Sequence, residues 1–508
     1  MEETSRRGVF PNVIDISHHS HYAVNKEALR SIPGLGRMLY TTLAVSVTAF
    51  ASGTTEGWSS PMILILSSEE NPINRVLTTS ETNKMVTYMK LSSIVNTMLC
   101  GFLCDRFGRR SGAWAISFLV PLGWGLLATL SDINGLYVGA ALIGSTTISG
   151  LVLGIIILSE MADDNVRGSL ISIIVFWYSC GVLLAHVLGE ICSFHVFNWV
   201  GFSISIISAI LLYTLPESPQ YLILKNRADD ARRSLQWYHG SDPTVIEDRM
   251  NGLKKTKTYV DCQKFMSCKG QRLSLLIIVF LNAFGELGGT TIIETYAGPI
   301  LSDTVKPAII TAGEGALMLA CIRFIAGMAS CYLIERSGRR ITLILSFVKM
   351  SIALALLSIM FWFNKEVGLE LEIYPPLVLL IIYTLANQMF LGTNEVISGE
   401  IASPSIRGVL MAVGGTTKII VSVLCLQVYS PLDELGKYGN FIYEACFCLL
   451  GAIISMYIIP ETQGKSLNTI SDELRGVHPA EDAGSDGAKS INDGTAVIEA
   501  ESCDGSRL

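Results

Sequence analysis

The sequence predicts an all-α membrane protein with twelve membrane-spanning helices. Of its 508 residues, 50% are hydrophobic and only 16% are charged, whereas a soluble chain carries about a quarter charged residues. The apolar residues gather into runs of about twenty, the length at which a helix crosses the hydrocarbon core of a bilayer. The charged residues are concentrated between these runs. Together these observations indicate a polytopic membrane protein and exclude an ordinary soluble domain.

The apolar runs fall into two groups of six, and each run ends where polar or charged residues begin. The first six spans are expected at residues 38–60, 84–104, 112–130, 135–159, 169–190 and 196–215. The other six are expected at residues 273–297, 308–334, 341–362, 374–399, 408–430 and 440–459. This grouping predicts two halves of six helices each.

A long polar insert separates the two groups. Residues 217–271 are too polar to enter a bilayer, and the segment from Ala228 to Tyr238 has the amphipathic spacing of a short helix. The tail beyond Ser466 is rich in Asp, Glu, Gly and Ser, a composition typical of disorder. We therefore expect five parts: an N-terminal tail at 1–37, a first half at 38–216, a linker with short helices at 217–271, a second half at 272–460 and a disordered tail at 461–508.

The distribution of Lys and Arg predicts the orientation, because basic residues accumulate on the cytosolic side of membrane proteins. If the N-terminus is cytosolic, the segments on that side hold 28 basic residues and the opposite loops hold 5, with 4 more inside spans, which accounts for all 37. We therefore expect both termini and the linker to be cytosolic.

Other functional classes receive no support from the sequence. It has no nucleophile and base set, phosphate loop or metal-ligand spacing, so we expect no enzyme activity, no cofactor and no bound metal. His18, His19 and His21 cluster in a polar tail without thiol or carboxylate partners, and we interpret them as solvated. No concentrated basic patch indicates nucleic-acid binding. The expected partners are the lipid bilayer and a small-molecule solute.

Three short motifs recur in the same order in both halves. The residues DRFGRR at 105–110 follow the second span, and ERSGRR at 335–340 follows the eighth. Glu160 stands seven residues before Arg167, as Glu400 stands seven before Arg407. The residues PES at 216–218 and PET at 460–462 end the two halves. These paired motifs indicate two homologous halves.

The motifs resemble those of the major facilitator superfamily, in its sugar-porter branch, and among these the insect trehalose and hexose facilitators. The resemblance covers about residues 38 to 470. It rests on Gly101 followed by DRFGRR, on PESPQYL at 216–222 and on PETQGKSL at 460–467. It implies the major facilitator fold of two pseudo-symmetric halves, working as a monomer in the plasma membrane. It also implies that the protein moves a small polar solute such as trehalose, a hexose or a polyol by alternating access.

Acidic and basic residues stand at the expected cytosolic ends of the helices, where they can pair across the two halves and hold that side closed. The alternative is that they only follow the distribution of positive charge and reach for lipid headgroups, which leaves the repeated spacing unexplained. The expected members of this cytosolic gate are Asp105, Arg106, Arg110, Glu160, Arg167 and Glu217 in the first half, with Glu335, Arg336, Arg340, Glu400, Arg407 and Glu461 in the second.

The expected solute pocket departs from the sugar-porter pattern. Where the family carries glutamines, asparagines and a tryptophan, this chain places charged residues in four spans, and the Gly-Pro-x-Pro-Trp stretch of the tenth span is absent. Charges inside a membrane are costly, so we expect them to face the pocket. The pocket residues implied by the resemblance are Glu286, Thr290, Thr291, Tyr296, Arg323, Asn387, Glu395 and Lys418.

The charged pocket leaves alternatives open. It can recognise a charged or zwitterionic solute, or it can bind a sugar through many hydrogen bonds. Glu286 and Glu395 can also pair with Arg323 and Lys418 only to lock the helices together. A protein of another class, a sensor that keeps the fold without transport, is the main rival to a transporter. Ion coupling is also open, because the family position of the proton-binding acid falls nearer Thr54 than Glu56.

Overall fold

The computed structural model describes residues 35–68, 71–73, 75–147, 149–161, 164–240, 243–255, 269–302, 310–367, 373–402 and 407–462. The N-terminal tail with its histidine cluster and the C-terminal tail beyond residue 462 lie outside the described residues. Every regular element in the described ranges is a helix.

The first half contains six spans built from eight helices. Two spans are divided by a short irregularity, since Phe118 separates α4 from α5 and a short interruption separates α6 from α7. The helices are α2 (Leu35–Leu66), α3 (Thr79–Phe107), α4 (Arg109–Ser117) with α5 (Leu119–Thr129), α6 (Ile133–Gly144) with α7 (Ser149–Met161), α8 (Asp164–Ile191) and α9 (Phe194–Thr214).

The second half repeats this arrangement with seven helices in six spans. Its first span is broken at Gly288 and Gly289, so that α14 (Lys269–Leu287) ends where α15 (Thr290–Ser302) begins. The others are continuous: α16 (Ala312–Ser337), α17 (Arg339–Val367), α18 (Tyr374–Ile401), α19 (Arg407–Leu435) and α20 (Lys437–Ile458).

Ten of these spans are long and apolar enough to cross a membrane. The remaining two, α2 and α3, are 32 and 29 residues long. They carry charged residues, including Glu56 and Lys90, that lower their hydropathy. Both pack inside the same bundle, α2 against α8 and α3 against α6 and α19. The architecture therefore has the twelve spans that the sequence predicts.

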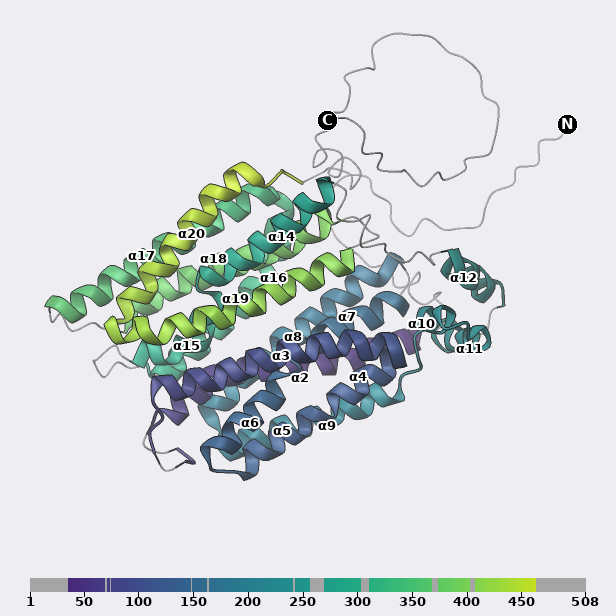
Figure 1. The fold of residues 1–508 in the computed structure, drawn as a ribbon, viewed down its shortest axis with the longest axis horizontal. Helices are drawn as coiled ribbons and strands as arrows, with labels where there is room; N and C mark the ends of the chain where they lie inside the picture. Colours follow the sequence, from purple (N-terminus) through teal and green to yellow (C-terminus); the bar gives the residue numbers. More distant parts are fainter. Residues whose placement is uncertain are drawn as a thin grey trace, which may run out of the picture.

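The linker helices lie together at one end of the bundle, which we name the linker end; we name the opposite end the far end (Figure 1). They are α10 (Pro219–Leu224), α11 (Ala228–His239) and α12 (Pro243–Lys255). α11 covers the segment predicted to be a short amphipathic helix. Arg37 at the start of α2 donates to the carbonyls of Gln236 and Trp237 at 3.2 and 2.9 Å, which fixes α11 to the first half.

The two halves lie side by side, the first in purple and blue and the second in green and yellow (Figure 1). One large apolar core includes buried residues of both halves, among them Trp58, Met62 and Met85 of the first and Tyr296 and Leu301 of the second. A separate apolar core consists of residues of the first half together with Tyr238 of the linker helix α11. The shared core shows that the halves are packed together along part of their length.

Candidate functional site

The hydrogen bonds between the two halves lie toward the far end. The Asn83 amide donates to the carbonyl of Leu426 at 2.5 Å and accepts from the Tyr296 hydroxyl at 3.3 Å. The Gln427 amide donates to Thr87 at 3.1 Å. We name these contacts the far-end closure.

Tyr296 strengthens this closure through its position and its backbone. Its ring is buried and stacks on Tyr429, with ring centroids 4.4 Å apart. The residue has non-helical torsion angles (φ −105°, ψ 16°), which kink α15. At the linker end, the ion pairs of Arg109 with Glu160 and of Arg339 with Glu400 each lie within one half. The protein is therefore held closed at the far end.

Three acid and base pairs lie in the middle of the bundle. Glu56 of α2 binds Lys90 of α3 at 2.9 Å. Glu294 of α15 binds Arg323 of α16 at 3.0 Å. The carboxylate of Glu286 in α14 lies 3.8 Å from the ammonium of Lys418 in α19. Each pair joins two neighbouring helices of one half.

The three pairs also interact across the boundary between the halves. Glu56 of the first half is attracted to Arg323 and Lys418 of the second. Lys90 is in turn attracted to Glu286 and Glu294. Because Coulomb interactions weaken with distance and with hydration, we treat the three pairs as one group. We name the six residues the charged centre.

The structure brings together three of the four charges predicted for the pocket, Glu286, Arg323 and Lys418. The alternative in which Arg323 pairs with Glu286 or Glu395 does not hold, because its partner is Glu294, which stands on the adjacent helix α15. Glu395 forms no ion pair among the described residues, although Lys418 attracts it. Its side chain is exposed, and it stands on α18 closer to the linker end.

The polar residues predicted for the pocket serve mainly to bind neighbouring helices. The Thr290 hydroxyl donates to the Gly285 carbonyl at 2.8 Å and makes a 3.0 Å hydrogen bond with Asn387. The Thr291 hydroxyl donates to the Glu286 carboxylate at 2.5 Å. Tyr296 belongs to the far-end closure. These contacts surround the break between α14 and α15, so the break is held by side chains on three helices.

The repeated motifs meet within each half. In the first half, the Arg109 guanidinium binds Glu160 at 3.1 Å, and the Ser218 hydroxyl donates to the same carboxylate. Glu217 accepts from the backbone N–H of Arg110 at 3.0 Å, at the first turn of α4. A carboxylate at a helix N-terminus satisfies free N–H groups and favours the helix dipole. We name this arrangement a motif bracket.

The second half contains the same bracket. Arg339 binds Glu400 at 3.2 Å. Glu461 accepts from the backbone N–H groups of Arg339 and Arg340 at 3.1 and 3.3 Å. The Arg340 guanidinium also donates to the Met456 carbonyl. The three motifs thus join the ends of four spans in each half.

Four acids named in the gate prediction, Glu160, Glu217, Glu400 and Glu461, form contacts at these helix ends, but each contact lies within one half. Arg109 and Arg339, which bind Glu160 and Glu400, were missed, and the repeated Gly-Arg-Arg was the signal that could have found them. Arg106, which was named, is exposed. The side chains of the other predicted members lie outside the described residues: Asp105, Arg167, Glu335, Arg336 and Arg407. The observed pairs lie within halves, and the pairing across halves stays a prediction.

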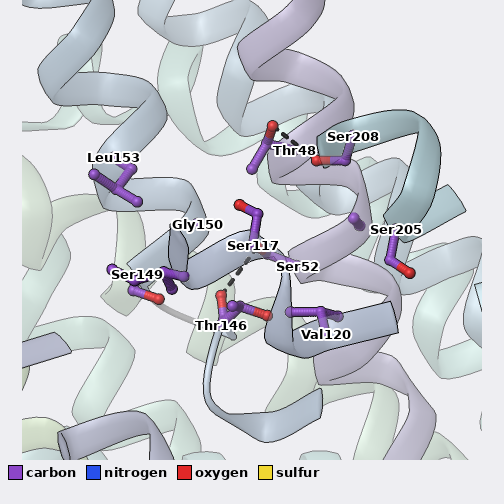
Figure 2. A pocket seen from close by; sticks show the side chains of 12 residues that line it. Thr48, Ser52, Ser117, Val120, Thr146, Ser149, Gly150, Leu153, Ser205 and Ser208 are labelled. Carbon is purple, nitrogen blue, oxygen red and sulfur yellow. Dashed lines mark hydrogen bonds between the residues drawn. The ribbon is translucent and has the colours of Figure 1, made fainter. Parts of the chain in front are cut away.

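A small cavity of about 20 Å³ lies inside the first half (Figure 2). Figure 2 shows Ser52 and Thr146, with Thr48 and Ser208, around it. The Ser52 hydroxyl donates to the Thr146 carbonyl at 3.0 Å, and Ser208 donates to Thr48 at 2.9 Å. The volume suits one or two water molecules rather than a sugar. This cavity is therefore separate from the charged centre.

Comparisons with known proteins identify the family. The family described as "Sugar (and other) transporter" matches residues 33–474. The facilitated trehalose transporter Tret1 of Aedes aegypti is 26% identical over 451 residues, covering 85% of this chain and 54% of that protein. Tret1 of Bombyx mori is 25% identical over 455 residues, covering 87% of each. The chain spans about half the length of some relatives, such as those of Aedes aegypti and Anopheles gambiae.

Solved structures show the same fold. The inward-open conformation of the xylose transporter XylE from E. coli matches with a TM-score of 0.66 and 18% identity, covering 86% of this chain and 99% of XylE. Its partially occluded inward-open conformation matches with a TM-score of 0.65. The predicted all-α major facilitator fold and the resemblance to sugar porters are confirmed. The chain is a multi-pass membrane protein that belongs to the sugar transporter family.

Proposed function

We propose that this protein carries a sugar or a sugar-like solute across a membrane by alternating access of the charged centre to its two sides. The observation that carries the proposal is the asymmetry of the contacts between the halves. The two halves are joined toward one end by hydrogen bonds of Asn83, Tyr296 and Gln427. Family membership supports the same conclusion, because the matched relatives are named as transporters. A transporter is favoured over an enzyme or a sensor.

The charged centre suits a neutral solute with many hydroxyl groups. Its three acids and three bases compensate one another, so a net charge on the solute is not required. Charged groups make stronger hydrogen bonds than neutral groups do. The side chains of Lys90 and Arg323 are 15% and 24% exposed, so both retain contact with the surroundings. We propose that they donate to solute hydroxyls while their carboxylate partners accept.

The proposal is tested by uptake into proteoliposomes. The panel contains trehalose, glucose, a polyol, an amino acid and an organic anion. Purified protein is expected to transport trehalose or glucose, and Lys90→Met is expected to abolish this transport. Lys349→Met is the matched control, because Lys349 is an exposed lysine in the middle of α17. Transport of only the amino acid or the anion would contradict the sugar proposal, and no transport of any compound would favour a sensor.

We also propose that the protein lies in the plasma membrane with the linker end in the cytosol. The 28 to 5 distribution of basic residues supports this orientation. In a variant whose native cysteines are replaced, Arg233→Cys reports on the linker end and Lys365→Cys on the far end; both positions are exposed. An impermeant thiol reagent outside intact cells is expected to label position 365 alone. Labelling of position 233 alone would show that the orientation is the reverse of the one proposed.

A further inference from the structure

Glu444 of α20 is a buried carboxyl group that the proposed transport function does not use. Its residue is only 3% exposed. Its Oε2 atom has no hydrogen-bond partner, and no basic group of the described residues lies within ion-pair distance. Burying an ionised carboxylate without a partner is very costly, whereas its protonated form is neutral. The surroundings therefore favour a bound proton at Glu444.

The carboxyl group rests directly on the break in the seventh span. Gly289 has a φ of +92°, which favours glycine. A β-carbon at Gly289 would lie only 2.6 Å from Oε2 of Glu444. The Gly288 carbonyl accepts from the Tyr383 hydroxyl at 2.9 Å, so the break is also held from α18. Glu444 thus packs against the backbone between the end of α14 and the start of α15.

The two segments on either side of the break carry functional contacts. α14 ends with Glu286 of the charged centre, and α15 carries Glu294 of the same centre and Tyr296 of the far-end closure. A small cavity of about 10 Å³ is lined by both Glu444 and Glu286. A change of charge at Glu444 would therefore act on the segment that keeps the far end closed.

No neighbouring group can neutralise an ionised Glu444 without giving up its own partner. Glu286, which lines the same small cavity, is itself a carboxylate, and its base Lys418 is already bound to it. The other titratable groups that interact electrostatically with Glu444 are neutral phenols and thiols: Tyr383 of α18, Cys425 of α19, and Tyr443 and Cys448 of α20. Lys349, on the packed helix α17, is exposed.

We infer that Glu444 is a proton-binding site whose occupancy sets the balance between the conformer closed at the far end and the conformer open there. With the proton bound, the neutral carboxyl group packs against Gly289 and this closed structure is favoured. When the proton leaves for water, the carboxylate needs hydration or a cation, and the packing at the break is lost. The link between this conformational equilibrium and transport rests on the proposed function, whereas the effect of the proton on the equilibrium does not.

The test measures spin-label distances across the far end in the full-length protein without solute, from about pH 5 to about pH 9. The ratio of open to closed conformers in the wild type is expected to rise with pH, by up to about tenfold per pH unit for one linked proton. Glu444→Gln imitates the protonated form and is expected to stay closed throughout. Glu247→Gln, a change at an exposed carboxylate of the linker helix α12, is the control and is expected to keep the wild-type pH dependence.

A second measurement does not depend on the folding of the variant. Infrared spectra of the wild type at neutral pH are expected to contain the carbonyl band of a protonated carboxylic acid, and this band is expected to persist in Glu395→Gln. No such band, or a conformer ratio that pH does not change, would overturn the inference. If the conformer ratio changes when choline replaces sodium, the inference would also be overturned, because the site would then bind a metal cation. Failure of solute uptake with an intact pH response would contradict only the transport proposal.

Discussion

Glu286 and Lys418 have very different surroundings, although they belong to one ion pair. The Glu286 side chain is 1% exposed, whereas the Lys418 side chain is 37% exposed. Glu286 also accepts a hydrogen bond from Thr291. A lysine left alone can reach water, but a buried carboxylate left alone keeps its full desolvation cost. The contribution of each residue to stability should therefore be unequal.

We predict that Lys418→Met destabilises the protein more than Glu286→Gln does. The expected loss for Lys418→Met is about 3 kcal/mol of unfolding free energy, the lower limit for breaking a buried pair, because the lysine is partly exposed. Adding Glu286→Gln to Lys418→Met should recover much of this loss, since it removes the unpaired charge. The measurement is denaturant unfolding in detergent, with Lys349→Met as the control.

A different outcome would reassign the partner of Lys418. If Glu395→Gln restores the stability of Lys418→Met and Glu286→Gln does not, Glu395 is the carboxylate that depends on the lysine.

The sequence could predict that these charges face a shared centre, because charged residues in spans avoid lipid. It could not predict that Arg323 binds Glu294. That pairing depends on how α15 and α16 pack, and no motif marks Glu294 or Glu444.

At the scale of elements, the motif brackets explain why a glycine stands between α3 and α4. Gly108 has φ 114° and ψ 159°, a region that other residues rarely adopt. A β-carbon there would lie 2.2 Å from Oε2 of Glu217. Gly338 occupies the equivalent turn between α16 and α17 with φ 79°. The glycine lets the following helix begin where the carboxylate can reach its N–H groups.

We predict that Gly108→Ala lowers the unfolding free energy by about 1–3 kcal/mol, because of the backbone conformation and the collision with Glu217. Gly101→Ala is the matched control, since a β-carbon at Gly101, inside α3, meets nothing within 4 Å. That change should be neutral or stabilising by up to about 1 kcal/mol, because alanine favours helix over glycine. Thermal unfolding of both variants in detergent decides the matter, and equal effects would contradict the bracket.

The sequence predicted that the repeated motifs stand at helix ends, but not which base in each motif binds the acid. Arg106 lies in the last turn of α3 and is exposed, whereas Arg109 follows the turn at Gly108 and reaches Glu160. Spacing along a sequence fixes the distance between residues only within one regular element. The turn changes the direction of the chain, so the better candidate could be identified only from the structure.

At the scale of the whole molecule, twelve spans in two halves were predictable because hydrophobic length and internal repetition are properties of the sequence itself. The end at which the bundle is closed could not be predicted from the sequence. That state depends on a few contacts between residues far apart in the chain, such as Asn83 and Leu426. Alternating access requires that these contacts be weak enough to break. The far-end closure meets this requirement, because it consists of a few hydrogen bonds between the halves.

We predict that Asn83→Leu shifts the protein toward a conformer that is open at the far end. The change removes two buried hydrogen bonds between the halves, one to the Leu426 carbonyl and one from the Tyr296 hydroxyl. Each contributes about 0.5–1.5 kcal/mol, so the ratio of open to closed conformers should rise about 5- to 150-fold. Thr97→Val is the control, because the Thr97 hydroxyl bonds only to Ser93 of its own helix. Spin-label distances across the far end measure the ratio, and an unchanged ratio in Asn83→Leu would show that the two hydrogen bonds of Asn83 do not keep that end closed.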